Sequence, residues 1–70
     1  MTLEQIRILA AVVEYGSLKK AAEILHKTQP ALSMAMQKLE AELGFLLLDR
    51  GQYRLTLTPH GAIFFRQARS

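Results

Sequence analysis

The chain has 70 residues, no cysteine and a net charge of +3, from nine Lys and Arg against six Asp and Glu. This length favours one small domain over an enzyme with a deep cleft. Without cysteine the chain has no disulfide and no thiolate metal site. We therefore expect neither a metal nor a cofactor. No apolar run approaches the roughly 20 residues of a membrane span and no signal peptide is recognisable, so we expect a cytoplasmic protein.

Two helices are predicted in the first 25 residues. Thr2 and Gln5 have the spacing of a capping box, and apolar residues then recur at helical spacing as far as Gly16. Ser17 is a good N-cap for a second, shorter helix that continues to Leu25. The apolar positions of the first helix are Leu3, Ile6, Leu9, Ala10 and Val13.

A third, longer helix is predicted to begin at Thr28, after a tight connection at His26, where histidine tolerates a positive φ. Pro30 lies in its first turn, where the missing N–H costs nothing, and Gly44 ends it. On a helical wheel one side of helix 28–43 is a core stripe of Leu32, Met36, Leu39 and Leu43. The opposite side carries Pro30, Ser33, Met34, Gln37 and Ala41, with Gln29 and Lys38 on its flanks.

The hydrophobic period changes after the third helix and predicts a two-stranded wing over residues 46–57. An apolar run at 46–48 is followed by a turn at 51–53 and by a half-buried alternation at 55–57. Thr58 followed by Pro59 then predicts a fourth helix that continues to the end of the chain.

These elements predict a mainly α fold, a winged helix-turn-helix with a three-helix core, a two-stranded wing and a C-terminal linker helix. We assign residues 1–57 to the winged helix-turn-helix domain and residues 58–70 to the start of the linker helix.

The charge pattern around the third helix favours a polyanionic partner. Between residues 24 and 39 the only charged side chains are Lys27 and Lys38, so no acid opposes a phosphate there. Small and amide-bearing side chains suit base edges, since Gln pairs with adenine and Met34 can touch a thymine methyl. Arg50 and Arg54 flank the turn of the wing, within reach of phosphates or a minor groove. We therefore expect helix 28–43 to enter the major groove of duplex DNA, with the wing on the backbone or in the minor groove.

Several segments also resemble the amino-terminal domain of LysR-type transcriptional regulators of bacteria. They are SLKKAAEILHKTQPALS at residues 17–33, Leu39-Glu40, Leu43-Gly44, Asp49-Arg50 and Leu57-Thr58-Pro59-His60-Gly61. Carried over by position, the resemblance implies that the major groove is lined by Thr28, Gln29, Pro30, Ser33, Met34, Gln37 and Lys38. It implies wing contacts for Arg50 and Arg54 and a phosphate at the helix start of Ser17. The family often has other residues at Met34, Met36 and Leu48, and Met34 leaves the base preference open.

The fourth helix resembles the family's linker helix, along which two subunits pair before the chain continues to an effector-sensing domain that is absent here. The apolar residues expected to provide pairing and packing are Ile63, Phe64, Phe65 and Ala68. The resemblance thus implies a homodimer on an operator of roughly two-fold symmetry. It also implies a nucleoid-associated location.

Two other classes of function have weaker support from the sequence. An enzyme has little support, because His26 and His60 are far apart in sequence and neither a carboxylate pair nor a glycine-rich phosphate loop accompanies them. A winged-helix module for protein–protein assembly is the alternative to DNA binding. The acid-free stretch and the small residues of the third helix argue against it.

Overall fold

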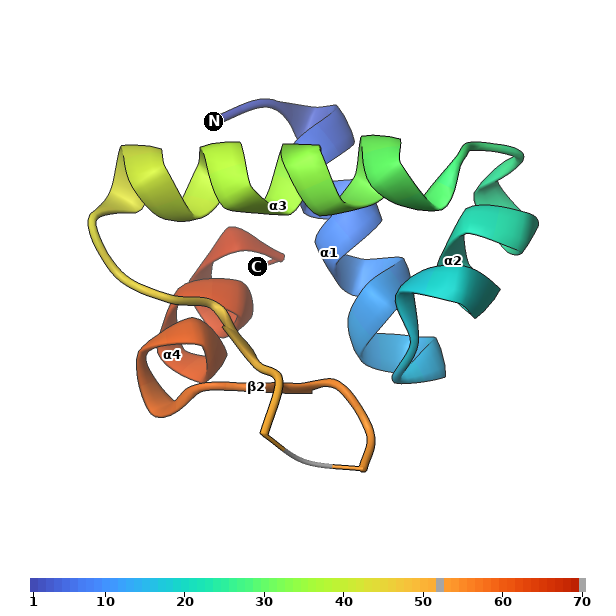
Figure 1. Ribbon diagram of the computed structural model, residues 1–70. Coiled ribbons are helices and arrows are strands. Elements are labelled where there is room, and N and C mark those ends of the chain that lie inside the picture. The colour runs from blue at the N-terminus through green and yellow to red at the C-terminus, as the bar shows by residue number, and fades with distance from the viewer. Residues whose placement is uncertain (52, 70) are drawn as a thin grey trace.

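The computed structural model describes residues 1–51 and 53–69 and has the predicted fold, a mainly α winged helix-turn-helix (Figure 1). Its elements, in chain order, are α1 (Leu3–Tyr15), α2 (Leu18–Leu25), α3 (Gln29–Leu43), β1 (Leu48–Asp49), β2 (Thr56–Leu57) and α4 (Pro59–Ala68). Figure 1 shows α3 lying across α1, with α2 at the amino end of α3 and α4 below its carboxyl half. The turn expected at 51–53 includes residue 52, which lies outside the described residues.

A hydroxyl side chain begins each of these helices, as the sequence predicted. The capping box of α1 is complete: Gln5 N donates to Thr2 Oγ1 (3.1 Å) and Thr2 N donates to Gln5 Oε1 (2.7 Å). The hydroxyl of Ser17 accepts from Lys20 N (3.1 Å). The hydroxyls of Thr28 and Thr58 accept in the same way from Ala31 N and Gly61 N. These bonds satisfy amides that have no partner within the helix and so fix where each helix starts.

Left-handed residues end the first three helices and turn the chain back onto the core. Gly16 (φ 65°), His26 (φ 58°) and Gly44 (φ 82°) take this conformation. Among residues 1–51 and 53–69, His26 is the one non-glycine residue with a positive φ, which confirms the tolerance expected of histidine. The turn at His26 brings α2 and α3 together with a connection of three residues, the spacing of a helix-turn-helix.

The core stripe of α3 was predicted correctly in most of its positions, whereas that of α1 was not. Leu32, Met36 and Leu39 are fully buried and Leu43 is half-buried. In α1 the buried face comprises Gln5, Ile8, Leu9 and Val12, while the predicted Ile6, Ala10 and Val13 are half-buried and Leu3 is 67% exposed. Apolar residues occur around most of α1, so its inward face is selected by packing on α2 and α3.

The wing is shorter than the expected 46–57 hairpin. Its strands pair antiparallel over two residues each, with Leu48 opposite Leu57 and Asp49 opposite Thr56. Leu47 and Leu48 are buried in the core, so the first apolar run serves packing more than strand pairing. Leu55 N donates to Gly16 O (3.0 Å), and this hydrogen bond connects the residue before β2 to the turn between α1 and α2.

The linker helix α4 uses Phe65 as a core residue, which corrects part of the expected pairing surface. Phe65 is 9% exposed and the guanidinium of Arg69 lies 5.2 Å from its ring centroid. Ile63 is 51% exposed, and Phe64 and Ala68 are half-buried. The side of α4 that remains accessible for a partner therefore contains Ile63, Phe64 and Ala68. Among the described helices, none is long and apolar enough to cross a membrane.

Candidate nucleic-acid interface

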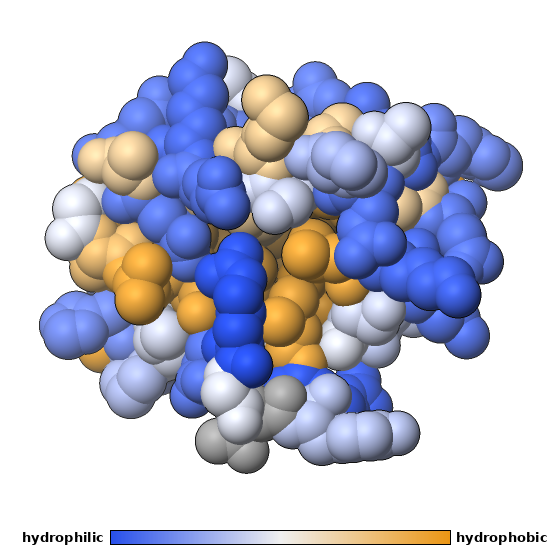
Figure 2. Space-filling view, in the orientation of Figure 1, coloured by the Kyte–Doolittle hydropathy of each residue, from blue (hydrophilic) through white to orange (hydrophobic). Residues whose placement is uncertain are grey.

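The exposed face of α3 presents uncharged and basic side chains to solvent. Met34 is 68% exposed, and Gln29, Pro30, Gln37 and Lys38 are exposed with it. Thr28 is exposed at the helix start, whereas Ser33 is half-buried. Along the edge that α3 occupies, Figure 2 shows moderately hydrophobic groups among hydrophilic ones. The structure thus brings the predicted groove residues onto one side of one helix.

Both carboxylates of α3 are turned away from this face. The side chain of Glu40 is buried, and Glu42 lies within 3.4 Å of the amino terminus of Met1 and of Gln5 Nε2. Glu40, the first acid after the acid-free residues 24–39, is therefore withdrawn from solvent. Glu42 remains 41% exposed, but its charge is paired with the amino terminus, which limits its repulsion of a polyanionic ligand.

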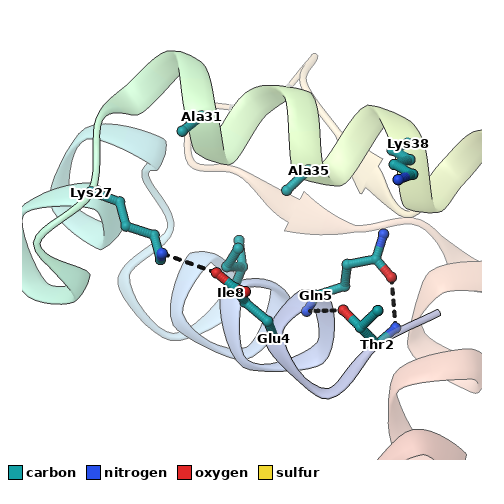
Figure 3. Close-up of a pocket in the computed structure, with 8 residues that line it drawn as sticks. All are labelled: Thr2, Glu4, Gln5, Ile8, Lys27, Ala31, Ala35 and Lys38. Carbon is teal, nitrogen blue, oxygen red and sulfur yellow. Dashed lines mark hydrogen bonds and ion pairs between the residues drawn. The ribbon is translucent and has the colours of Figure 1, made fainter.

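Lys27, one of the two cations in the acid-free stretch, is held by an acid from another helix. Lys27 Nζ lies 2.9 Å from Glu4 Oε1 of α1, as Figure 3 shows. The hydrogen bond and charge of Lys27 lower the pKa of the exposed Glu4 carboxyl below its usual value. In the same view Ala31 and Ala35 of α3 line a shallow pocket over α1, with Lys38 at its side. The pair thus ties the turn before α3 to α1.

The two wing arginines are both exposed but have different neighbours. Arg50 Nη1 lies 4.0 Å from Glu40 Oε2, on the side of α3. Arg54 packs its guanidinium against Gly16, and its Nη2 donates to Glu14 O (3.4 Å) at the carboxyl end of α1. Because Ser17 follows Gly16, Arg54 lies beside the amino end of α2. The wing therefore places one arginine next to α3 and the other next to the start of α2.

Glu40 is a buried carboxylate beside the wing arginine Arg50, a position that was not predicted from the sequence. It is 7% exposed, and its Oε2 accepts hydrogen bonds from Leu47 N (2.8 Å) and Leu48 N (3.2 Å). A signal for its burial was present, because Glu40 lies only about 40° from Met36 on the wheel, at the edge of the core stripe. Its partners could not be read from the sequence, since they belong to the segment that enters the wing.

The accessible part of α4 adjoins a small aromatic cluster. The Phe45 ring lies 6.4 Å from that of Phe64 in an edge-on arrangement and 5.6 Å from that of His60. With Leu43, Ile63 and Gln67 these residues line a shallow, mainly apolar depression. His60 is exposed, and its ring packs against Phe45.

Comparisons with known proteins agree with this architecture. Residues 3–62 match the family model described as "Bacterial regulatory helix-turn-helix protein, lysR family". The chain is 46% identical over 65 residues to a "Probable RuBisCO transcriptional regulator" of Porphyra purpurea, covering 93% of this chain and 20% of the relative. It is 45% identical over 67 residues to the "HTH-type transcriptional regulator YtlI" of Bacillus subtilis, covering 96% and 21%. The chain thus spans about a fifth of the length of these relatives.

Solved structures of DNA complexes have the same fold. A complex of the BenM DNA-binding domain with benA site 1 DNA superposes with a TM-score of 0.93 at 45% identity, covering 99% of this chain and 78% of that one. A complex of the CbnR DNA-binding domain with DNA gives a TM-score of 0.90 at 40% identity, with 99% and 79% covered. Full-length BenM also matches, with 23% of its chain covered.

Proposed function

The chain belongs to the lysR family of bacterial regulatory helix-turn-helix proteins, and on that premise we propose that it is the duplex-DNA-binding domain of a transcriptional regulator. The observation that carries the proposal is the exposed face of α3, which combines amide, small and apolar side chains, while Glu40 is buried and the exposed Glu42 is paired with the amino terminus. The similar domains of BenM and CbnR were solved in complex with DNA. This function requires neither catalytic chemistry nor a cofactor, and its ligand implies a location at the nucleoid, in the cytoplasm.

In the proposed complex α3 lies in the major groove, and different side chains of the helix contact different base edges. The amides of Gln29 and Gln37 pair with adenine edges, and the thioether of Met34 contacts a thymine methyl. Thr28, Pro30 and Lys38 line the groove at its flanks. Ser33 has a smaller role than expected, because it is half-buried.

The wing and the start of α2 hold the phosphate backbone in this proposal. Arg50 contacts the backbone or the minor groove on the side of α3. Arg54 and the free amides at the start of α2 offer a second phosphate position, since the Arg54 guanidinium packs beside Gly16, immediately before Ser17. These contacts position the domain and carry little sequence information.

We further propose that the full-length regulator pairs through the accessible side of α4. Ile63, Phe64 and Ala68 provide this surface, while Phe65 remains in the core of each subunit. Two-fold pairing would present two α3 helices to two half-sites of a roughly symmetric operator.

Selection of bound sequences from a random duplex pool, followed by affinity measurements over a salt series, tests the function. Phosphate contacts predict that log affinity falls against log salt with a slope of about −0.9 per phosphate neutralised. A flat response would exclude DNA binding of this kind and favour a protein partner.

Two substitutions test the division of roles. Arg50→Ala is expected to weaken binding to selected and random duplexes alike, whereas Gln29→Ala should relax the preference at one base position by about 1–3 kcal/mol. Arg7→Ala is the matched control, since Arg7 is an exposed arginine of α1 outside the proposed interface. Equal losses on both duplexes for Arg50→Ala and Gln29→Ala would refute the division.

A further inference from the structure

A buried carboxylate joins the helix proposed to read DNA to the first strand of the wing. Glu40 lies in the last turn of α3, and one of its oxygens, Oε2, accepts from the amides of Leu47 and Leu48 at 2.8 and 3.2 Å. The same oxygen faces Arg50 Nη1 at 4.0 Å. Glu40 therefore contacts the residue before β1, the first residue of β1 and the arginine that follows β1.

A charge at this position needs an explanation, because an apolar side chain there would extend the core stripe. Burying a carboxylate is unfavourable unless hydrogen bonds and an opposite charge compensate it. Both kinds of compensation come from the wing segment: two backbone amides and one guanidinium. The carboxylate is thus suited to fixing where the wing lies relative to α3.

The position of Glu40 relative to Arg50 affects which N–H donors of the guanidinium a phosphate can reach. Glu40 faces one terminal nitrogen of the guanidinium, and guanidinium carries five N–H donors in a rigid fork. The donors on the outer side stay available, since the arginine side chain is 41% exposed. A carboxylate 4.0 Å from the inner nitrogen attracts that side of the guanidinium and so favours an orientation in which the outer donors face solvent.

We infer that Glu40 is a positioning residue for DNA binding, which sets the wing relative to α3 and orients Arg50 toward the phosphate backbone. This inference rests on the proposed function. It differs from a purely structural role because the charge of Glu40, and not only its hydrogen bonds, is required.

The variant Glu40→Gln separates the two contributions. An amide oxygen can replace Oε2 as acceptor for Leu47 N and Leu48 N, so the wing keeps its attachment, but the negative charge facing Arg50 is lost. The second attachment of the wing, from Leu55 N to Gly16 O, is untouched. Glu42→Gln is the matched control, since Glu42 is also on α3 but faces the amino terminus.

The experiment compares two duplexes, one long enough to reach the wing and one trimmed on the wing side to the bases under α3. Wild type, both glutamine variants, Arg50→Ala and the double variant Glu40→Gln/Arg50→Ala are titrated with each. The ratio of the two affinities cancels any change in the folded fraction, because both duplexes meet the same protein population. A variant that is partly unfolded therefore still gives an interpretable result.

We expect Glu40→Gln to weaken binding to the long duplex by about three- to tenfold and to leave the short duplex unchanged. In the Arg50→Ala background the same substitution should have no further effect, and Glu42→Gln should behave as wild type. Equal losses on both duplexes, an unchanged ratio, or additive effects with Arg50→Ala would overturn the inference while leaving DNA binding intact. Wild type that binds neither duplex would instead overturn the proposed function.

Discussion

The close approach of α4 to the segment that enters β1 predicts that Gly61→Ala destabilises the domain. Gly61 is buried in the first turn of α4, where its amide donates to Thr58 Oγ1 (2.9 Å). A Cβ at this position would overlap the carbonyl oxygen of Leu47 and lie 3.0 Å from Leu47 Cα. Both are backbone atoms, so the overlap cannot be relieved by rotating a side chain.

The size of the effect follows from three opposing contributions. Replacing Gly by Ala within a helix favours folding by about 1 kcal/mol. Overpacking a tight contact costs about 1–3 kcal/mol. Moving the Leu47 carbonyl also weakens the hydrogen bond it accepts from Thr58 N (2.9 Å), at about 0.5–1.5 kcal/mol. The net loss is therefore roughly 0.5–3.5 kcal/mol, or about 2–28 °C in Tm for a domain of this size.

Urea unfolding followed by circular dichroism measures this loss. The matched control is the reciprocal change at the next residue, Ala62→Gly, which is exposed and should cost about 1 kcal/mol through helix propensity alone. If propensity alone governed both positions, Gly61→Ala would stabilise the domain by a similar amount. A Gly61→Ala variant as stable as wild type, or more stable, would refute the clash with Leu47.

Three further outcomes test single contacts. Uracil lacks the methyl group of thymine, so replacing thymine by uracil in the selected site should weaken DNA binding by the wild-type domain at one position, by about 1 kcal/mol. Binding by Met34→Ala should be insensitive to the same replacement. Equal sensitivity of the two proteins would exclude the proposed contact. Ser17→Ala should cost about 1 kcal/mol in urea unfolding because α2 loses its cap on Lys20 N, and an unchanged midpoint would contradict that role. Because Lys27 lowers the pKa of Glu4, the stabilisation from this pair is present above the ordinary glutamate pKa and is lost as pH falls through the lowered pKa. An NMR titration should show that the midpoint of Glu4 rises in the variant Lys27→Met. An unchanged midpoint would count against the pair.

Local interactions explain why the helix starts could be predicted. The caps at Thr2, Ser17, Thr28 and Thr58 join residues three apart, so the residue types and their spacing contain all the information needed. The stripe of α3 was also readable, because a single side of that helix carries large apolar residues. The exposed face followed from the stripe.

The errors share a dependence on distant partners. In α1 and α4 apolar residues point in several directions, so the elements packed against each helix determine which residues are buried. In α1 they bury Ile8 and leave Leu3 exposed, and in α4 they bury Phe65. The bonds of Glu40 depend on amides seven and eight residues away, beyond a chain reversal. One neighbour of Arg54, the carbonyl of Glu14 at the carboxyl end of α1, lies 40 residues earlier in the chain. None of these choices has a local signature.

One side of α3 packs in the core and the other is exposed to solvent, and this separation has an evolutionary consequence. Leu32, Met36 and Leu39 hold the helix in the core, whereas Met34 and Gln37 lie on the exposed face. Surface substitutions away from buried contacts usually change stability by less than about 0.5 kcal/mol. A descendant of this domain could therefore acquire a new operator by exchanging exposed residues one at a time, without passing through unstable intermediates.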